Sequence, residues 1–238
     1  MDLLRTMRNR QDEAEESAVR GGIVSDVMQE DGTRVITKTN NTVVIISPDG
    51  RREIRKPDIG VTQLTPDGRK IFTGEDGEVI ETLPEHERPF NVVSTSTNEG
   101  ARLLSNFAHT PFVLDDVRYH SVEGFYVSLK FSDAKKRREM AKLFGAEAKD
   151  AGKSHKPTET IYGGVTIKMG SPEHQALIGR AIRAKIEQNP EVAKALIESY
   201  PREIIHNTGR PDHPKSNFPA TVFVKILTEL RDEFRQRE

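Results

Sequence analysis

The chain has 238 residues, of which 34% are hydrophobic and 31% are charged, and its formal net charge is −1. This length allows one large domain or two small ones, and the near-neutral charge excludes a general electrostatic attraction to nucleic acid or to an anionic membrane. The absence of cysteine excludes disulfides, thiolate metal sites and thiol nucleophiles. No stretch approaches the ~20 apolar residues of a membrane span and no secretory signal is visible, so we expect a cytoplasmic protein.

Residues 1–22 are predicted to form a charged helix that acts as an arm. Leu3, Leu4 and Met7 are thinly spaced among Arg, Asp and Glu residues, and Gly21-Gly22 ends the helix. So sparse an apolar stripe buries little surface, and we therefore expect the helix to fray or to dock on a partner.

Residues 23–84 are predicted to form a small antiparallel domain of β-hairpins. Short segments rich in β-branched residues lie at 34–37, 42–46, 52–55, 69–72 and 78–81. Asp-Gly and Asn-Asn pairs between them favour tight turns, and Pro48-Asp-Gly-Arg51 repeats as Pro66-Asp-Gly-Arg69. We expect a meander, a short solenoid or an open sandwich without catalytic groups, which packs on the second domain, on its own copies or on a larger assembly.

Residues 82–89 are predicted to be a linker, and residues 90–238 a second domain that is mainly helical. Its predicted helices lie at 122–131, 134–144, 172–188, from 190 onward and at 219–235, and residues 145–160 are predicted to be a surface loop. Ser121 and Ser171-Pro172 are typical helix starts, because a Ser oxygen accepts from first-turn N–H groups and Pro fits the first helical position. The predicted fold class is α+β with two domains.

The helix at 122–131 carries an unusual polar stripe. Glu123 and Lys130 are two turns apart, and Tyr126 lies between them on the same face. On so apolar a helix, such groups either face solvent, as in an ordinary amphipathic helix, or are paired or functional. Lys185 lies beside the apolar stripe of its own helix, which makes it either a pocket residue or a Lys whose stem alone is buried.

Four motifs in order resemble the NADAR family (NAD- and ADP-ribose-associated) over about residues 90–231. They are Ser105-Asn106-Phe107, Pro111-Phe112, the Tyr119-x-Ser-x-Glu-x-x-Tyr-x-x-x-Lys-Phe131 helix and Ala184-Lys185-x-x-Gln188-Asn189-Pro190. That family includes N-glycosidases of riboflavin-pathway intermediates. The chain departs from the family at Val127, where many members have Gln, and in lacking Trp, for which Tyr162 is the nearest substitute. Asp212 and Asn217 are the nearest counterparts of a missing Asp/Trp/Gly loop.

The resemblance implies a hydrolase that cleaves the N-glycosidic bond of a ribosylated nucleotide, either a riboflavin-pathway intermediate or ADP-ribosyl-guanine, including ADP-ribosylated nucleic acid. Glu123 would stabilise the cationic transition state or activate water, and Lys130 would bind phosphate or form a Schiff base. The implied substrate-binding residues are Ser105, Asn106, Phe107, Tyr119, Tyr126, Tyr162, Lys185, Asp212 and Asn217. No cofactor is expected, and His206 and His213 lack a third ligand at metal spacing.

Two alternatives to the enzyme stay open. The pocket would bind an ADP-ribose or NAD derivative without turnover, which the altered loop favours. Residues 1–84 would otherwise mount the chain in a viral or other assembly, in the virion or the host cytoplasm; this second alternative is compatible with enzymatic activity.

Overall fold

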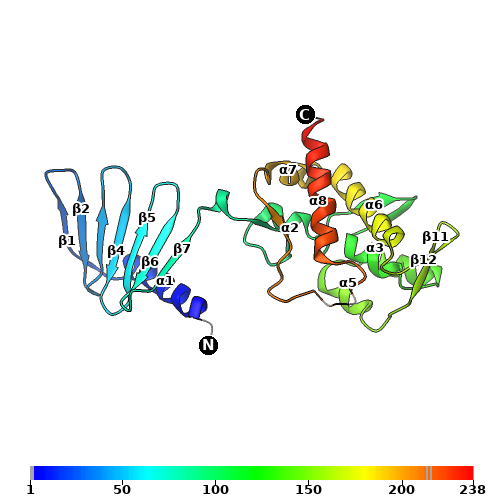
Figure 1. The fold of residues 1–238 in the computed structure, drawn as a ribbon, viewed down its shortest axis with the longest axis horizontal. Helices are drawn as coiled ribbons and strands as arrows, with labels where there is room; N and C mark the ends of the chain where they lie inside the picture. The colour runs from blue at the N-terminus through cyan, green and yellow to red at the C-terminus, as the bar shows by residue number, and fades with distance from the viewer. Residues whose placement is uncertain (1–2, 213, 215, 238) are drawn as a thin grey trace. The chain divides into compact units, whose positions relative to one another are not determined.

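The computed structural model describes residues 3–212, 214 and 216–237. It divides into two compact units, Met1–Arg88 and Pro89–Glu238, and each is described by itself (Figure 1). The predicted α+β class is confirmed: a seven-stranded antiparallel sheet precedes a unit that mixes helices with small sheets. None of the described helices is long and apolar enough to cross a membrane.

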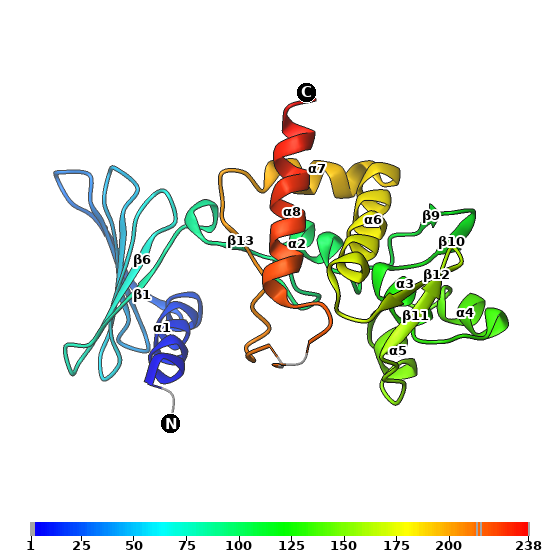
Figure 2. The same cartoon turned by 45° about the vertical axis from the view of Figure 1, so that its right-hand side comes forward.

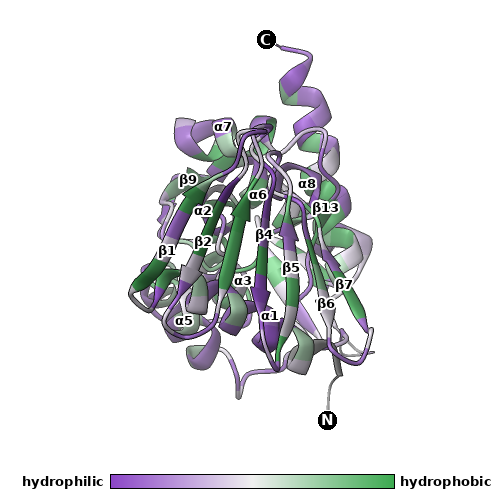
Figure 3. Cartoon of the chain, turned by 90° about the vertical axis from the view of Figure 1, so that its left-hand side faces the viewer, coloured by the Kyte–Doolittle hydropathy of each residue, from purple (hydrophilic) through white to green (hydrophobic). Residues whose placement is uncertain are grey.

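The first unit is a meander in which each strand pairs with the next along the chain. Its elements are α1 (Leu3–Val19), β1 (Ile23–Met28), β2 (Arg34–Lys38), β3 (Val43–Ile46), β4 (Arg52–Lys56), β5 (Gly60–Leu64), β6 (Lys70–Gly74), β7 (Val79–Thr82) and the 3-10 turn η1 (Glu85–Glu87). Figure 3 shows the strands side by side, with the hydrophilic β4 beside more hydrophobic neighbours. Gly32, Gly50 and Gly68 occupy equivalent turns with positive φ, which explains why each of these turns carries an Asp-Gly pair.

The expectation that residues 1–22 form an arm that frays or docks on a partner is wrong, because α1 packs on the sheet of its own unit. Met7 and Ala14 of α1 are buried against Ile59, Phe72 and Ile80, and α1 contacts β4, β5, β6 and β7. The sheet supplies the large side chains, so a helix with few apolar residues is sufficient. Strand β1, at the edge of the sheet, instead keeps its apolar side chains exposed.

The second unit surrounds one main apolar core with helices. Its elements are β8 (Phe90–Asn91), α2 (Glu99–Leu104), β9 (Phe112–Leu114), β10 (Val117–Tyr119), α3 (Val122–Ser128), α4 (Ala134–Met140), α5 (Gly145–Ala151), β11 (Glu159–Tyr162), β12 (Val165–Lys168), α6 (Pro172–Gln188), α7 (Pro190–Glu198), β13 (Ile204–Ile205) and α8 (Ala220–Arg235). Phe125, Ile182, Leu196 and Leu227 are fully buried in this core, and α6, α7 and α8 contact one another (Figure 2).

Two helix boundaries differ from the prediction. The expected helix at 122–131 ends at Ser128. The segment after Ala134 forms two helices, α4 and α5, because Phe144 is extended and Gly145 has a φ of 59°. Residues 145–151 are therefore helical rather than part of a surface loop. The small sheets pair β9 with β10, β11 with β12, and β8 with β13, the last pair in parallel.

Candidate active site

Helix α3 is held in place at its first turn. The Ser121 Oγ accepts a hydrogen bond from the Gly124 N–H (2.8 Å) and donates one to the Leu143 carbonyl (2.9 Å). A Cβ on Gly124 would lie only 2.5 Å from the same carbonyl, so no larger residue fits there without a shift. The N-cap and the close contact together fix the direction in which the neighbouring Glu123 leaves the helix.

The segment Ser105-Asn106-Phe107 is anchored by its three consecutive carbonyls. The Ser105 carbonyl accepts from Lys185 Nζ of α6 (2.8 Å), the Asn106 carbonyl from the Glu123 N–H of α3 (2.9 Å), and the Phe107 carbonyl from the Gly145 N–H of α5 (3.0 Å). Three helices thus fix one short loop, which presets the directions of its side chains.

The end of α6 holds the chain that follows this loop. Gln188 both donates to the Val113 carbonyl and accepts from the Val113 N–H, each at 2.8 Å. Asn189 donates to the Pro111 carbonyl at 3.1 Å. The Lys-x-x-Gln-Asn motif of the sequence therefore holds residues 105–113 in place.

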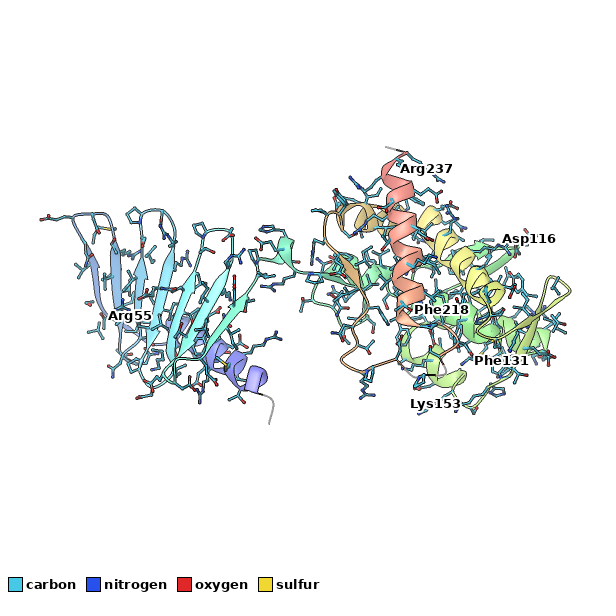
Figure 4. The ribbon with its side chains drawn as sticks, viewed as in Figure 1. Arg55, Asp116, Phe131, Lys153, Phe218 and Arg237 are labelled. Atoms are coloured by element: carbon cyan, nitrogen blue, oxygen red, sulfur yellow. The ribbon has the colours of Figure 1, made fainter. Side chains whose placement is uncertain are left out.

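These elements surround a cavity of about 320 Å³, a volume within the ~300–1,000 Å³ range of small-molecule sites. Of the residues proposed from sequence, the structure brings together Ser105, Asn106, Phe107, Glu123, Tyr126 and Asp212 around it. The Asp212 carboxylate also accepts from the Ala220 N–H at 2.6 Å, at the start of α8. Phe218, which Figure 4 labels near the same helix start, also lines the cavity.

Glu123 is the most perturbed acid of the cavity. Burial raises its pKa from the ordinary 4.5 to about 7, while the positive charges of Lys130 and Lys149 act in the opposite direction. No described residue donates a hydrogen bond to its carboxyl group, and the buried Asn106 Oδ1 likewise has no described partner. A buried acceptor without a partner, beside a carboxyl group that reaches the same cavity, favours a ligand that brings hydrogen-bond donors, such as sugar hydroxyls.

Lys130 lies beside the cavity, outside its described lining. Its Nζ donates to the Gly152 carbonyl (3.1 Å) and lies 4.9 Å from the centre of the Tyr126 ring. Burial lowers the pKa of Lys130, although Glu123 favours its charged form. Burial likewise raises the pKa of Tyr126, and a hydrogen bond with Asn217 opposes that rise. Lys130 and Asn217 therefore influence the site through the pKa values of Glu123 and Tyr126.

Three other residues proposed for substrate binding are not part of the described lining of the cavity and make structural contacts instead. Tyr119 is buried with its ring 5.0 Å from that of Phe125. The Tyr162 hydroxyl donates to Asp115 at 2.7 Å, and the Lys185 ammonium is buried against the Ser105 carbonyl. Burial lowers the pKa of Lys185 to about 7.

The structure also adds lining residues that sequence reasoning missed. They are Lys149, Ile178, His206, Ser216, Phe218, Ala220 and Phe223. Lys149 lies on α5, where the sequence predicts a surface loop, and Ile178 and Phe223 lie within the predicted helices at 172–188 and 219–235. Periodicity alone carries no signal that distinguishes a cavity wall from a core face.

The histidines do not gather into a metal site among the described residues. His206 Nδ1 lies 2.6 Å from the Val92 carbonyl, which fixes its ring at the cavity wall. His213, the other histidine of this loop, lies outside the described residues.

Comparisons with known proteins concern this second unit. The family model described as "Bacteriophage protein GP30.3" matches residues 99–232. An uncharacterized 17.1 kDa protein from the Gp30-rIII intergenic region of Enterobacteria phage T4 is 28% identical over 134 residues, which cover 54% of this chain and 88% of that protein. The NMR structure of the E. coli protein YbiA has a TM-score of 0.48 and 21% sequence identity, and the match covers 64% of this chain and 90% of that chain.

Proposed function

The chain belongs to the bacteriophage GP30.3 family, and from the cavity within the matched segment we propose that residues 89–238 hydrolyse the N-glycosidic bond of a ribosylated nucleotide. The observation that carries the proposal is Glu123, an acid with a pKa near 7 and no described hydrogen-bond donor in a concave site. The sequence resemblance to the NADAR family supplies the substrate class, a riboflavin-pathway intermediate or ADP-ribosyl-guanine.

In the proposed reaction, water replaces the base at the anomeric carbon. The bond between that carbon and the base nitrogen breaks as positive charge develops on the sugar, and the Glu123 carboxylate stabilises this charge. Glu123 then accepts a proton from the attacking water while the new C–O bond forms, and it passes this proton to the departing nitrogen. A base with a pKa near 7 suits both transfers at neutral pH.

The neighbouring residues bind and orient the substrate. The Asn106 Oδ1, which lacks a described partner, accepts from a sugar hydroxyl or an amide. Lys149 reaches the cavity from α5 and holds a phosphate, a role first considered for Lys130. Lys130 is engaged with the Gly152 carbonyl and favours the ionised form of Glu123 instead.

The test measures release of free base from both substrate classes by wild type, Glu123→Gln and the control Glu159→Gln, whose residue lies on β11 outside the described lining of the cavity. We expect turnover in wild type and the control, and a loss of at least ~100-fold in Glu123→Gln, as for removal of a general base. If wild type binds one of these compounds tightly and leaves it unchanged, the site is a binding module and not a hydrolase. If none of these compounds binds and none releases free base, the proposal is contradicted.

A second function, self-assembly, is favoured by strand β1. This edge strand exposes Ile23, Val24, Val27 and Met28 by 54–64% each, and the charge of Asp26 is already balanced by Arg34 at 2.5 Å. The outer edge of such a strand pairs readily with another strand, and a two-fold axis would place two copies of β1 antiparallel. We propose that β1 of a second copy of this chain pairs with this edge.

Sedimentation velocity tests this assembly. We expect a dimer of wild type that Val27→Lys dissociates, because a charge on the edge opposes strand pairing. Val79→Lys serves as the control, since Val79 is 61% exposed on the opposite edge strand β7. A monodisperse wild-type monomer across the concentration range, or equal effects of the two variants, would argue against pairing through β1.

A further inference from the structure

A second cavity of about 520 Å³ lies next to the candidate active site. It is bounded by α2, by the loop that contains Phe107 and His109, and by the start of α5. Its volume is within the ~300–1,000 Å³ range of ligand sites. Phe107 lines both cavities, so the two sites share the loop whose carbonyls the three helices hold.

Helix α5 borders both cavities as well. Gly145 and Ala146 line the second cavity, and Lys149, one turn further along the helix, lines the first. One ligand with two ends could therefore contact the same short helix in both cavities.

The second cavity presents an aromatic surface. Phe144 lines it and is 43% exposed, although it is among the largest apolar side chains of the unit. Its ring centre lies 4.5 Å from that of His109, with 32° between the ring planes, and His109 in turn lies 5.2 Å from His120. An exposed ring supported by a second ring is a ready platform for a planar heterocycle.

The cavity also presents a guanidinium group without a described acidic partner. Arg102 donates through one nitrogen, Nη1, to the Ser96 carbonyl (2.8 Å) and to the Thr97 carbonyl (3.2 Å). These bonds fix the group, and its other nitrogens have no acceptor among the described residues. A fixed guanidinium with free donors fits a phosphate. Glu99, one turn before Arg102, lines the same cavity and is the acid that a phosphate must avoid.

The surroundings of His120 show the same positive character. Its pKa is lowered first by burial and then by electrostatic repulsion from His109, Arg118 and Lys142. Arg118 and Lys142 therefore place positive charge near His120, although the whole chain is close to neutral.

We propose that the second cavity is a nucleotide-binding subsite, which stacks an aromatic base on Phe144 and holds its phosphate with Arg102. Resting on the proposed function, this subsite takes the half of the substrate distant from the bond that is cleaved. The substrate is then a dinucleotide-like molecule or a modified residue within a nucleic acid, because each carries a second nucleotide beside the scissile one.

Calorimetric binding of AMP tests the subsite directly in wild type, Phe144→Ala, Arg102→Gln and Ile161→Ala. Ile161 is the matched control, because it is a large apolar residue, 56% exposed, outside the described lining of both cavities. We expect Phe144→Ala and Arg102→Gln to weaken AMP binding about tenfold each, in line with a lost stacking or phosphate contact, and Ile161→Ala to leave it unchanged. Thermal unfolding checks that each variant is folded, and the Phe144 side chain makes no cap hydrogen bond that its removal would break.

Two further ligands separate the sources of the nucleotide. ADP-ribose binding more tightly than AMP indicates a free dinucleotide-like substrate. A short oligoadenylate binding more tightly than ADP-ribose, with affinity that falls steeply as salt rises, indicates a nucleic acid. Both results support the subsite if they depend on Phe144 and Arg102.

The subsite and the glycosidase can fail separately. AMP binding that depends on Phe144 in both wild type and Glu123→Gln supports the subsite even when no base is released from any substrate. Undetectable AMP binding at millimolar concentration, or binding that neither Phe144→Ala nor Arg102→Gln weakens, would overturn the subsite even when hydrolysis is observed.

Discussion

Glu123 links the proposed chemistry to the stability of the fold. Its carboxyl keeps its proton in the folded state up to pH about 7, whereas in the unfolded chain it ionises near 4.5. Between these values the folded state binds more protons, so the stability contributed by this group is full below pH 4.5 and is lost as pH rises through 7. At pH 8 the loss amounts to at most about 3 kcal/mol.

We therefore predict that Glu123→Gln is more stable than wild type at pH 8 and equally stable at pH 5, where Gln resembles the protonated acid. Denaturant unfolding of both proteins at the two pH values measures the difference. A variant that is equally stable or less stable at pH 8 would show that the carboxylate is well solvated or paired, which would also remove the reason for its raised pKa.

Lys185 titrates in the opposite sense. Burial lowers its pKa from 10.5 to about 7, so between these values the unfolded chain binds more protons than the folded protein. Stability should then rise with pH above 7. We predict that Lys185→Met loses this rise between pH 7 and 9, whereas Lys194→Met keeps it, because Lys194 is exposed on α7. Thermal unfolding across this pH range distinguishes the two; identical pH profiles would contradict a buried, titrating Lys185.

Individual site residues were only partly predictable from sequence. Glu123 and Lys185 stood out because a charge on an apolar helix face is unusual at any position. Lys149 and Phe144 carried no such signal, since a Lys and a Phe in a polar segment look like ordinary surface residues. Tyr119 and Tyr162 followed from motif position, but packing directs one into the core and the other to Asp115.

At the scale of elements, the contact between α3 and α4 determines whether the site forms. A Cβ at Gly124 would meet the carbonyls of Leu143 and Met140 at 2.5 Å and 2.9 Å. Backbone atoms cannot move aside singly, so we predict that Gly124→Ala destabilises the protein by more than about 2 kcal/mol. Gly179→Ala is the control, because a Cβ there meets Ile226 at an ordinary 3.5 Å.

Chemical denaturation of the two alanine variants gives the comparison. Alanine at Gly179, in the middle of α6, should be neutral or stabilising by up to ~1 kcal/mol, since it favours the helix. If Gly124→Ala is as stable as Gly179→Ala, then α3 and α4 can move apart without loss of stability.

Elements set by local chemistry were predictable, and elements set by distant contacts were not. The N-cap serines 121 and 171 start α3 and α6 as predicted, because capping depends on neighbouring residues alone. The strand β5 has few large β-branched residues and was missed, and it forms because β4 and β6 pair with it. The parallel pair of Ile204 with Phe90 joins segments far apart in sequence, for which no local pattern exists.

For the whole molecule, the change from alternating to helical periodicity after residue 84 was enough to predict two parts of different class. It could not predict that α1 belongs with the sheet, because Met7 and Ala14 of α1 are buried against Phe72 and Ile80, which lie far from α1 in the sequence. A sparse apolar stripe therefore gives too low an expectation of how well a helix packs when its partner surface is rich in large side chains.

The two units should differ in stability, because their cores differ in size. The first has a small cluster around Phe72 and leaves β1 exposed, whereas the second buries a cluster that extends through α3, α6, α7 and α8. Stability from burial scales with the apolar area removed from water. We predict two transitions in calorimetric unfolding of the full chain, of which the one at lower temperature belongs to residues 1–88. A chain of residues 89–238 should then show only the upper transition and keep AMP binding that depends on Phe144. A single transition in the full chain, or loss of folding in the shorter one, would show instead that the second unit needs the first.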